Sequence, residues 1–333
     1  MRRFAWLLAG LTLFLICSGG MVTSKGVGLA VPDWPTTFGY NMFLFPVSQW
    51  VGGILFEHTH RLIASAVGLL TIALALWLWR VEERRWLRVL GFIALGAVVL
   101  QGVLGGLRVT MLKDEIGVFH ACLAQAFLGL LVFIGVATSR SWGRAAVQMS
   151  SPLAWLPIAT TLLIFAQLAL GAMMRHQHRD LSILDFPTAY GSVIPDVSAE
   201  HLAEINRWRE ARALSEVTAG HIWLQMAHRV VAVVILCGVT AYCIAIRRRR
   251  NIQSGALRAL STWWFFLLGA QITLGAWTIW SNKAADIATA HVAGGAAMLS
   301  LGVAISAFAL RARRPARSDL PPEIIAREKA HAL

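Results

Sequence analysis

Apolar residues form eight long runs along the chain, separated by shorter polar segments. Each run is about 20 residues long or more, which is the length a helix needs to cross the hydrocarbon core of a bilayer. None of the runs shows the alternating pattern of a barrel strand. The pattern therefore predicts an all-α integral membrane protein with eight transmembrane helices. The predicted spans are 4–23, 54–79, 87–108, 117–138, 153–174, 221–246, 259–281 and 287–310.

Arginine residues are concentrated in every second segment between these runs. The arginine-rich segments are 2–3, 80–88, 139–144, 247–258 and 311–317, and the segments that alternate with them are 24–53, 109–116, 175–220 and 282–286. Because positively charged segments stay on the cytoplasmic side, we expect both termini in the cytoplasm. The protein is then a multi-pass protein of the cell's inner (cytoplasmic) membrane, or of the mitochondrial inner membrane in a eukaryote. The stretch 198–214 predicts an amphipathic helix on the outer surface.

The composition agrees with a membrane protein and argues against a nucleic-acid-binding one. Of the 333 residues, 57% are hydrophobic and only 14% are charged, against about 25% charged residues in soluble domains. The net charge of +13 comes from arginine clusters that the topology explains, so we expect no nucleic-acid partner and contact with membrane lipid instead. The four cysteines lie inside apolar runs without CxxC spacing, which is typical of small buried side chains. They are Cys17, Cys122, Cys237 and Cys243.

Four landmarks recur in the same order in the two halves of the chain. VPDWPTTFGY (31–40) matches ILDFPTAYGS (183–192), and the His-Arg pair at 60–61 matches the pair at 228–229. The remaining two matches are Gln101-x-x-Leu-Gly with Gln271-x-x-Leu-Gly, and His120 with His291. Each half begins and ends on the arginine-rich side, so the repeat is parallel rather than inverted.

The repeat predicts two tandem (parallel) four-helix bundles. We expect an N-terminal unit at 1–146, a C-terminal unit at 147–318 and a cytoplasmic tail at 319–333. The first apolar run follows Met-Arg-Arg and could pass for a signal peptide. The repeat pairs this run with the fifth one, so we retain it as a helix of the fold.

Four of the ten histidines share one position in the predicted fold: His60, His120, His228 and His291. Each lies near the start of an even-numbered span, and all even-numbered spans run from the outside to the inside. The four side chains should therefore lie at nearly one depth, close to the outer face, where ionisable residues usually mark a site. We expect the histidines at 176, 178, 201 and 331 at the surface, and we assign no role to those at 58 and 221.

Two imidazoles from facing helices of a bundle suit the two axial positions of a haem iron. A zinc site would need cysteine or carboxylate ligands nearby, and a cation path would need acids; the spans offer neither. The sequence thus predicts two iron sites, with His60 and His120 as ligands in the first unit and His228 and His291 in the second. Nearby glycines leave room for a flat macrocycle, although close helix packing explains them equally well. They are Gly102, Gly105, Gly106, Gly294 and Gly295.

An acidic side chain distinguishes the two units. Glu57 stands three residues before His60 on the same helix face, and Gln225 takes the matching place before His228. A carboxylate beside a haem edge can accept a proton or stabilise positive charge, whereas an amide cannot. We therefore expect chemistry in the first unit and an electron-transfer haem in the second.

Several arginines lie at the outer ends of the predicted spans. Arg61 and Arg229 follow the histidines directly, and Arg108 and Arg175 end other spans. These side chains could pair with haem propionates, or they could simply extend to the membrane interface.

The chain resembles the haem A synthase family over residues 1–310. The resemblance is carried by Glu57-x-x-His60-Arg61 and by four further motifs. These are FHACLAQAFLG at 119–129, RHQHRDLSILDFPTAYG at 175–191, QMAHR at 225–229 and HVAGGA at 291–296. The parallel duplication of four-helix units is also similar to that family.

The resemblance implies a function and a division of labour. A haem A synthase oxidises the C8 methyl group of haem O to a formyl group, through an alcohol and a geminal diol, for cytochrome oxidase. The resemblance places the substrate haem at His60 and His120, a haem b at His228 and His291, and the important acid at Glu57. Some members carry cysteine pairs in their outer loops, and this sequence lacks them.

Two other functions remain open at this stage. A two-haem cytochrome b would place its haems near opposite faces, so the four histidines at one depth and the unmatched Glu57 argue against it. A haem carrier or exporter shares every ligand feature. The sequence leaves undetermined the electron donor, the oxygen source, the oligomeric state, any contact with haem O synthase, and whether the alcohol leaves between steps.

Overall fold

The computed structural model describes residues 1–143, 151–177, 179, 181–249 and 255–312. Within this part of the chain, eight helices are long and apolar enough to cross a membrane. They are α1 (Arg2–Ser24), α2 (Gly52–Val81), α3 (Arg85–Met111), α4 (Asp114–Ala137), α6 (Ser151–His176), α8 (Ala219–Arg248), α9 (Gly255–Trp280) and α10 (Ala285–Ala312). Each corresponds to one predicted span, which confirms the expectation of an all-helical, multi-pass membrane protein.

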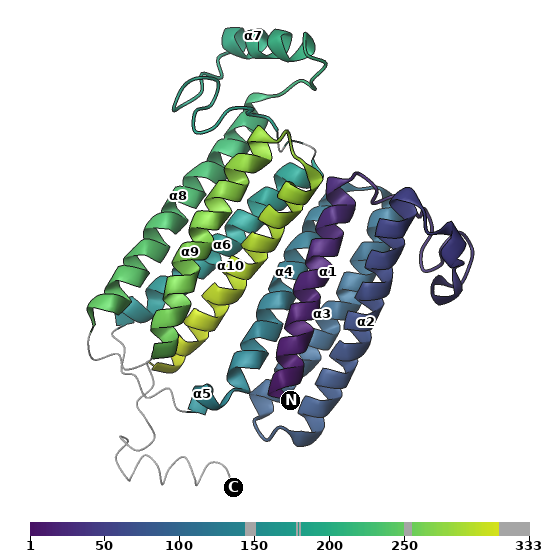
Figure 1. Cartoon of the computed structure of the whole chain (residues 1–333), viewed down its shortest axis with the longest axis vertical. Helices are drawn as coiled ribbons and strands as arrows, with labels where there is room; N and C mark the ends of the chain where they lie inside the picture. The colour runs from purple at the N-terminus through teal and green to yellow at the C-terminus, as the bar shows by residue number, and fades with distance from the viewer. Residues whose placement is uncertain (144–150, 178, 180, 250–254, 313–333) are drawn as a thin grey trace.

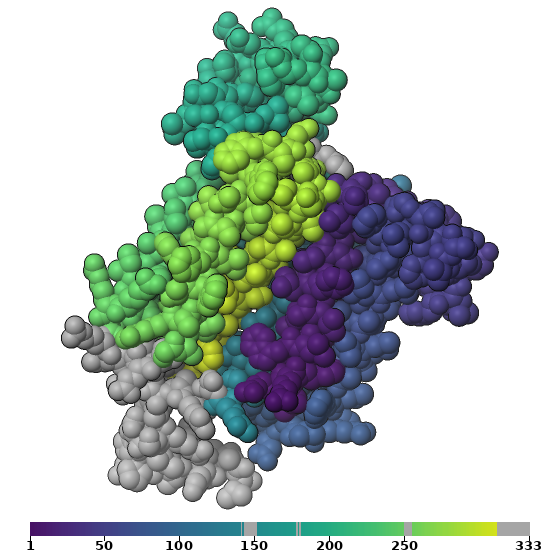
Figure 2. Space-filling view, viewed as in Figure 1, coloured from purple at the N-terminus to yellow at the C-terminus, as the bar shows by residue number. Residues whose placement is uncertain are grey.

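The shorter elements lie in the connections between these helices. They are η1 (Met42–Leu44), η2 (Val47–Gln49), α5 (Arg140–Gly143) and α7 (Ala199–Glu210). Helix α7 falls inside the predicted amphipathic stretch, and its loop projects beyond the ends of the long helices in Figures 1 and 2. The described residues contain no named strand, only two isolated bridges, Thr37 with Tyr40 and Ala189 with Ser192.

The long helices pack as two groups of four (Figure 1). In the first group α1 and α3 each contact both α2 and α4, so α2 and α4 lie diagonally across the bundle. In the second group α6 and α9 each contact both α8 and α10, and α8 and α10 are the diagonal pair. The groups meet where α1 and α4 contact α10 and where α4 contacts α6.

The extent to which each long helix is buried follows from this arrangement. Helix α10 contacts helices of both groups, and 56% of its most apolar window is buried, against 17% for α3 at the periphery. The outward faces carry large apolar side chains that are exposed to the surroundings. Such a distribution suits a protein whose solvent is lipid, because lipid tails are as apolar as the core.

The division into tandem units is an interpretation of the sequence that the packing accommodates. The boundary between 146 and 147 lies outside the described residues, as does the tail at 319–333. The correspondence of α1 with α6, α2 with α8, α3 with α9 and α4 with α10 follows from the sequence offsets. In each group the first and third long helices both contact the second and the fourth, so helices that match in sequence also have matching neighbours.

Candidate functional site

Each of the four histidines packs against a glycine on the preceding long helix. His60 lies in α2 and faces Gly19 of α1, where an added Cβ would stand 2.9 Å from the ring carbon Cε1. The same contact occurs between His120 and Gly105, between His228 and Gly171, and between His291 and Gly275, at 3.3, 3.4 and 3.0 Å. Each glycine, having no side chain, therefore leaves space for an imidazole ring to pack against the helix backbone. We call each of these four contacts a glycine seat. Only Gly105 belongs to the glycines selected from the sequence.

The structure brings the histidines together as the predicted pairs. His60 and His120 come from the diagonal helices α2 and α4 and lie close enough to interact electrostatically. His228 and His291 do the same from α8 and α10. A diagonal pair projects into the middle of a bundle, which is where bundle proteins hold a cofactor.

The Nδ1 atom of each of the four rings lies beside the glycine that the ring packs against. All four side chains are half-buried. Their Nδ1 atoms are buried and have no hydrogen-bond partner among the described residues. Leaving a buried polar atom unpaired is costly, so each such atom calls for an explanation. Within the described residues no three histidine, cysteine, aspartate or glutamate side chains come together as a metal site.

Three of the four histidine helices are also attached to the neighbouring helix by a glutamine. The Nε2 atoms of Gln101, Gln167 and Gln271 donate to the backbone carbonyl oxygens of His120, His228 and His291, at 3.1, 2.8 and 2.8 Å. Each glutamine stands four residues before the glycine seat on the same helix. Gln101 and Gln271 were recognisable as repeat landmarks. Gln167 is not one of these landmarks and was not predicted. The spacing Gln-x-x-x-Gly, which all three glutamines share, would have identified it.

His60 lacks this glutamine. Leu15 stands four residues before Gly19, at the place that glutamine holds on the other three helices. Hydrogen bonds between membrane helices stabilise by about 0.6 kcal/mol on average. The turn of α2 around His60 therefore lacks the hydrogen bond to the preceding long helix that the turns around the other three histidines have.

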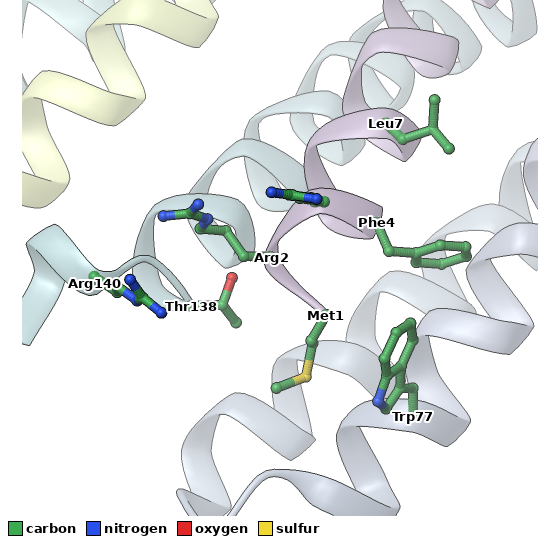
Figure 3. A pocket seen from close by; sticks show the side chains of 8 residues that line it. Met1, Arg2, Phe4, Leu7, Trp77, Thr138 and Arg140 are labelled. Carbon is green, nitrogen blue, oxygen red and sulfur yellow. The ribbon is translucent and has the colours of Figure 1, made fainter.

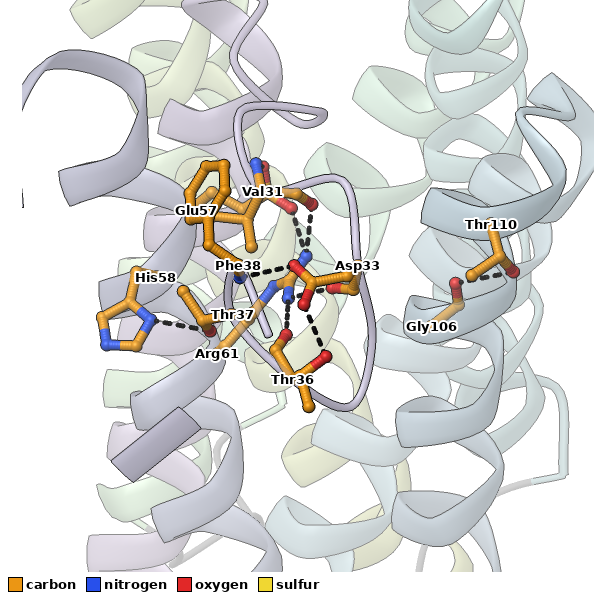
Figure 4. Close-up of polar contacts among 10 residues, drawn as sticks. All are labelled: Val31, Asp33, Thr36, Thr37, Phe38, Glu57, His58, Arg61, Gly106 and Thr110. Carbon is orange, nitrogen blue, oxygen red and sulfur yellow. Dashed lines mark hydrogen bonds and ion pairs between the residues drawn. The ribbon is translucent and has the colours of Figure 1, made fainter. Parts of the chain in front are cut away.

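The loop after α1 is fastened to α2 by Arg61 and Glu57 (Figure 4). The guanidinium of Arg61 donates to the carbonyl oxygens of Val31, Asp33 and Thr36, at 2.8, 2.7 and 3.2 Å. It also pairs with Glu57 at 2.8 Å. The second carboxylate oxygen of Glu57 accepts the amide of Val31 at 2.9 Å. Glu57 is thus a buried carboxylate with both oxygens engaged.

The loop after α6 is pinned in nearly the same way. Arg229 donates to the carbonyl oxygens of Asp185 and Thr188, at 2.7 and 2.8 Å. Gln225 takes the place of Glu57: its Oε1 accepts the amide of Ile183 at 2.8 Å and its Nε2 donates to the carbonyl of the same residue at 3.1 Å. Both groups therefore fasten an outer loop over the start of the histidine-bearing helix.

Inside each loop an aspartate folds the chain back on itself. Asp33 accepts the amides of Phe38 and Gly39, and Asp185 accepts those of Tyr190 and Gly191. Burial raises the pKa of each carboxyl, but hydrogen bonds, including one from a threonine hydroxyl, outweigh it, so both pKa values lie below the ordinary one. The shared sequence Asp-aromatic-Pro-Thr is therefore a structural turn that Arg61 and Arg229 hold in place.

The four outer arginines have different surroundings. Arg61 and Arg229, which could pair with propionates, bind loop carbonyls in this structure. Arg175 at the end of α6 donates to the carbonyl of Gly20 at 2.8 Å and to Ser24, and so joins the two groups. Arg108, in the last turn of α3, lies within electrostatic range of Glu57, His60 and His120.

The remaining histidines have local roles. His58 is fully buried, lies 3.3 Å from the Thr37 hydroxyl through Nδ1 and packs against the rings of Phe45 and Trp50. His221 forms a capping box with Thr218 at the start of α8. His176 lies against Gly117 of α4. The histidines at 178 and 331 lie outside the described residues.

A groove of about 700 Å³ opens at the other end of the molecule (Figure 3). It surrounds the first turns of α1, and its lining includes Arg2, Arg3 and Arg140. These residues are far along α1 from the Gly19 seat, and two of the arginine-rich segments supply the positive charge. The groove is therefore separate from the histidine pairs.

Two imidazoles in the core of each of two four-helix groups define the class: a multi-pass helical-bundle protein with a pair of histidines at the centre of each bundle. The particular family follows from comparison with known sequences. Residues 41–303 match the model of the COX15-CtaA family, described as cytochrome oxidase assembly protein, and the chain belongs to this family.

Relatives of known name align with most of the chain. The chain is 25% identical to heme A synthase of Geobacillus kaustophilus over 334 aligned positions, covering 94% of this chain and 93% of the relative. Heme A synthase of Shouchella clausii is 28% identical, with 70% of this chain and 79% of the relative covered. Heme A synthase of an Exiguobacterium species is 25% identical, with 85% and 84% covered.

Proposed function

We propose that this protein is a haem A synthase, which oxidises the C8 methyl group of haem O to a formyl group for cytochrome oxidase. The observation that carries the proposal is the pair of glycine-seated imidazoles on diagonal helices, present in both four-helix groups. Membership of the cytochrome oxidase assembly family and similarity to heme A synthases support it.

The two sites divide the work. The first site, with His60 and His120, binds the substrate haem O. The second, with His228 and His291, holds a haem b, which when bound accepts electrons and passes them on. The difference between Glu57 and Gln225 supports this assignment, since the residues around the first pair include a buried carboxylate. Arg108 adds a cation within electrostatic range of the first pair.

Glu57 is the residue we assign to proton handling in the first site. Oxidation of a methyl group to an alcohol by water releases two electrons and two protons, and a second such step gives the geminal diol, which loses water to form the aldehyde. A buried carboxylate can take up one of these protons or stabilise positive charge on the substrate. The hydrogen bond from Val31 and the ion pair with Arg61 hold this carboxylate in one orientation.

Pigment analysis tests the function. The protein is produced in cells that make haem O but no haem A, and the extracted haems are separated by chromatography. We expect haem A with the wild-type protein and none with His60→Ala. His201→Ala, which changes a histidine on the outer helix α7, serves as the control and should keep the activity. Recovery of haem O alone with a folded, haem b-containing protein would favour the haem carrier.

A further inference from the structure

Arg108 lies near the first pair of histidines. It lies in the last turn of α3, and its guanidinium packs on Gly28 in the loop after α1. A Cβ added at Gly28 would stand 3.1 Å from Nη2 and 3.3 Å from Nη1. The glycine therefore lets the planar group lie directly against the loop backbone.

The guanidinium has charge neighbours but no bonded partner. Within the described residues it makes no hydrogen bond and no ion pair within 4.0 Å, although it is half-buried. It lies within electrostatic range of Glu57 and Asp114 and of the imidazoles of His60 and His120. Arg61, the nearest arginine to His60 along the sequence of α2, already binds three backbone carbonyls and Glu57. A guanidinium offers five donors, and those of Arg108 are still available.

The second group carries no cation at the position that aligns with Arg108. The offset that aligns Gln101 with Gln271 places Thr278 of α9 opposite Arg108. The hydroxyl of Thr278 donates to the carbonyl of Leu274 in its own helix, at 2.8 Å. Arg108 is therefore a feature of the first site and not of the repeated scaffold.

We propose that Arg108 binds a carboxylate side arm of the tetrapyrrole in the first site, and so orients that substrate between His60 and His120. The inference rests on the proposed function, because it presupposes a tetrapyrrole substrate at the first pair. A guanidinium recognises a carboxylate through two parallel hydrogen bonds, which gives direction as well as attraction. The half-buried setting strengthens this contact relative to one in water.

Porphyrin titration tests this contact. Purified protein with its resident pigment is titrated in detergent with ferric protoporphyrin IX and, separately, with its dimethyl ester, and the added Soret band is followed. His60→Ala identifies binding at the first site. We expect Arg108→Gln to weaken diacid binding about 10- to 100-fold and to leave ester binding unchanged. The affinity of Arg108→Lys for the diacid should lie between those of the wild type and Arg108→Gln, because lysine keeps the positive charge but cannot make the two parallel hydrogen bonds of a guanidinium.

Lys113→Gln is the matched control, since it removes an exposed positive charge from the same outer end and should bind both porphyrins like the wild type. The proposal is overturned if Arg108→Gln retains the diacid preference, or loses affinity equally for both compounds. If the wild-type protein binds no added porphyrin, or if His60→Ala leaves this binding unchanged, the proposed function fails together with this inference. Binding that depends on His60 but not on Arg108 overturns this inference alone.

Discussion

At the residue scale, the informative pair is Glu57 and Gln225. Both side chains are buried, and both accept the amide of the loop residue that lies across from them, Val31 or Ile183. An amide at this position can therefore also accept the hydrogen bond from the loop. Glu57 differs in its negative charge, which pairs with Arg61 and makes it the side chain of the two that can take up a proton.

We expect Glu57→Gln to fold and to keep its resident pigment, but to lower the rate of haem A formation by about 100-fold or more, the range usual for loss of an acid–base group. The rate is measured from haem A extracted over time, and the visible spectrum reports the resident pigment.

Gln225→Glu is the reciprocal control and should leave the rate of haem A formation nearly unchanged. Normal haem A production by Glu57→Gln would remove the carboxylate from the mechanism and leave it as a fastener of the loop.

At the scale of elements, the histidine helices are positioned by small residues on their neighbours. Gly19, Gly105, Gly171 and Gly275 admit the four rings, and glutamines fasten three of the helices. The spans and their approximate ends could be predicted from hydropathy, because each helix satisfies its own backbone in lipid. The glycine seats could not be predicted from hydropathy, because each seat depends on which faces of two neighbouring helices meet.

Gly275→Ala should disturb the second site. The new methyl group would stand 3.0 Å from Cε1 of His291, and such overpacking costs about 1–3 kcal/mol. We expect the fraction of protein carrying low-spin haem to fall roughly tenfold, as measured by pigment content per purified protein.

Gly269→Ala lies on the same helix and is the matched control, because nothing stands within 4 Å of its added Cβ. Equal pigment content in the two variants would mean that the glycine seat does not position His291.

At the scale of the whole molecule, α10 and α1 join the two groups. Ser24 of α1 lies 3.0 Å from the hydroxyl of Thr289, two residues before His291. Gly19 faces His60, and the next residue, Gly20, faces Thr289 on the helix that carries His291. A single turn of α1 therefore lies between these two histidine-bearing helices. Helix α7 lies beyond one end of the long helices (Figure 1), and the four histidines fall in the first third of α2, α4, α8 and α10.

The charge pattern predicts which end faces outward. In a variant whose four native cysteines are replaced by alanine, we expect Val193→Cys to react with a membrane-impermeant maleimide in intact cells, since Val193 is 83% exposed. Glu83→Cys, in the arginine-rich connection between α2 and α3, should react only after permeabilisation. The opposite labelling pattern would reverse the orientation and place the histidine pairs near the cytoplasmic face.

The sequence by itself determined the eight spans, the pairing of histidines by repeat, and the contrast between Glu57 and Gln225. These are properties of hydropathy and spacing along one chain. Only the tertiary structure decided that Arg61 and Arg229 fasten loops, that Gln167 belongs to the site, and that Arg108 keeps its donors available. Each of these depends on contacts between residues far apart in sequence, such as Arg61 with Val31 and Gln167 with His228, and the distances that make such contacts exist only once the helices have packed.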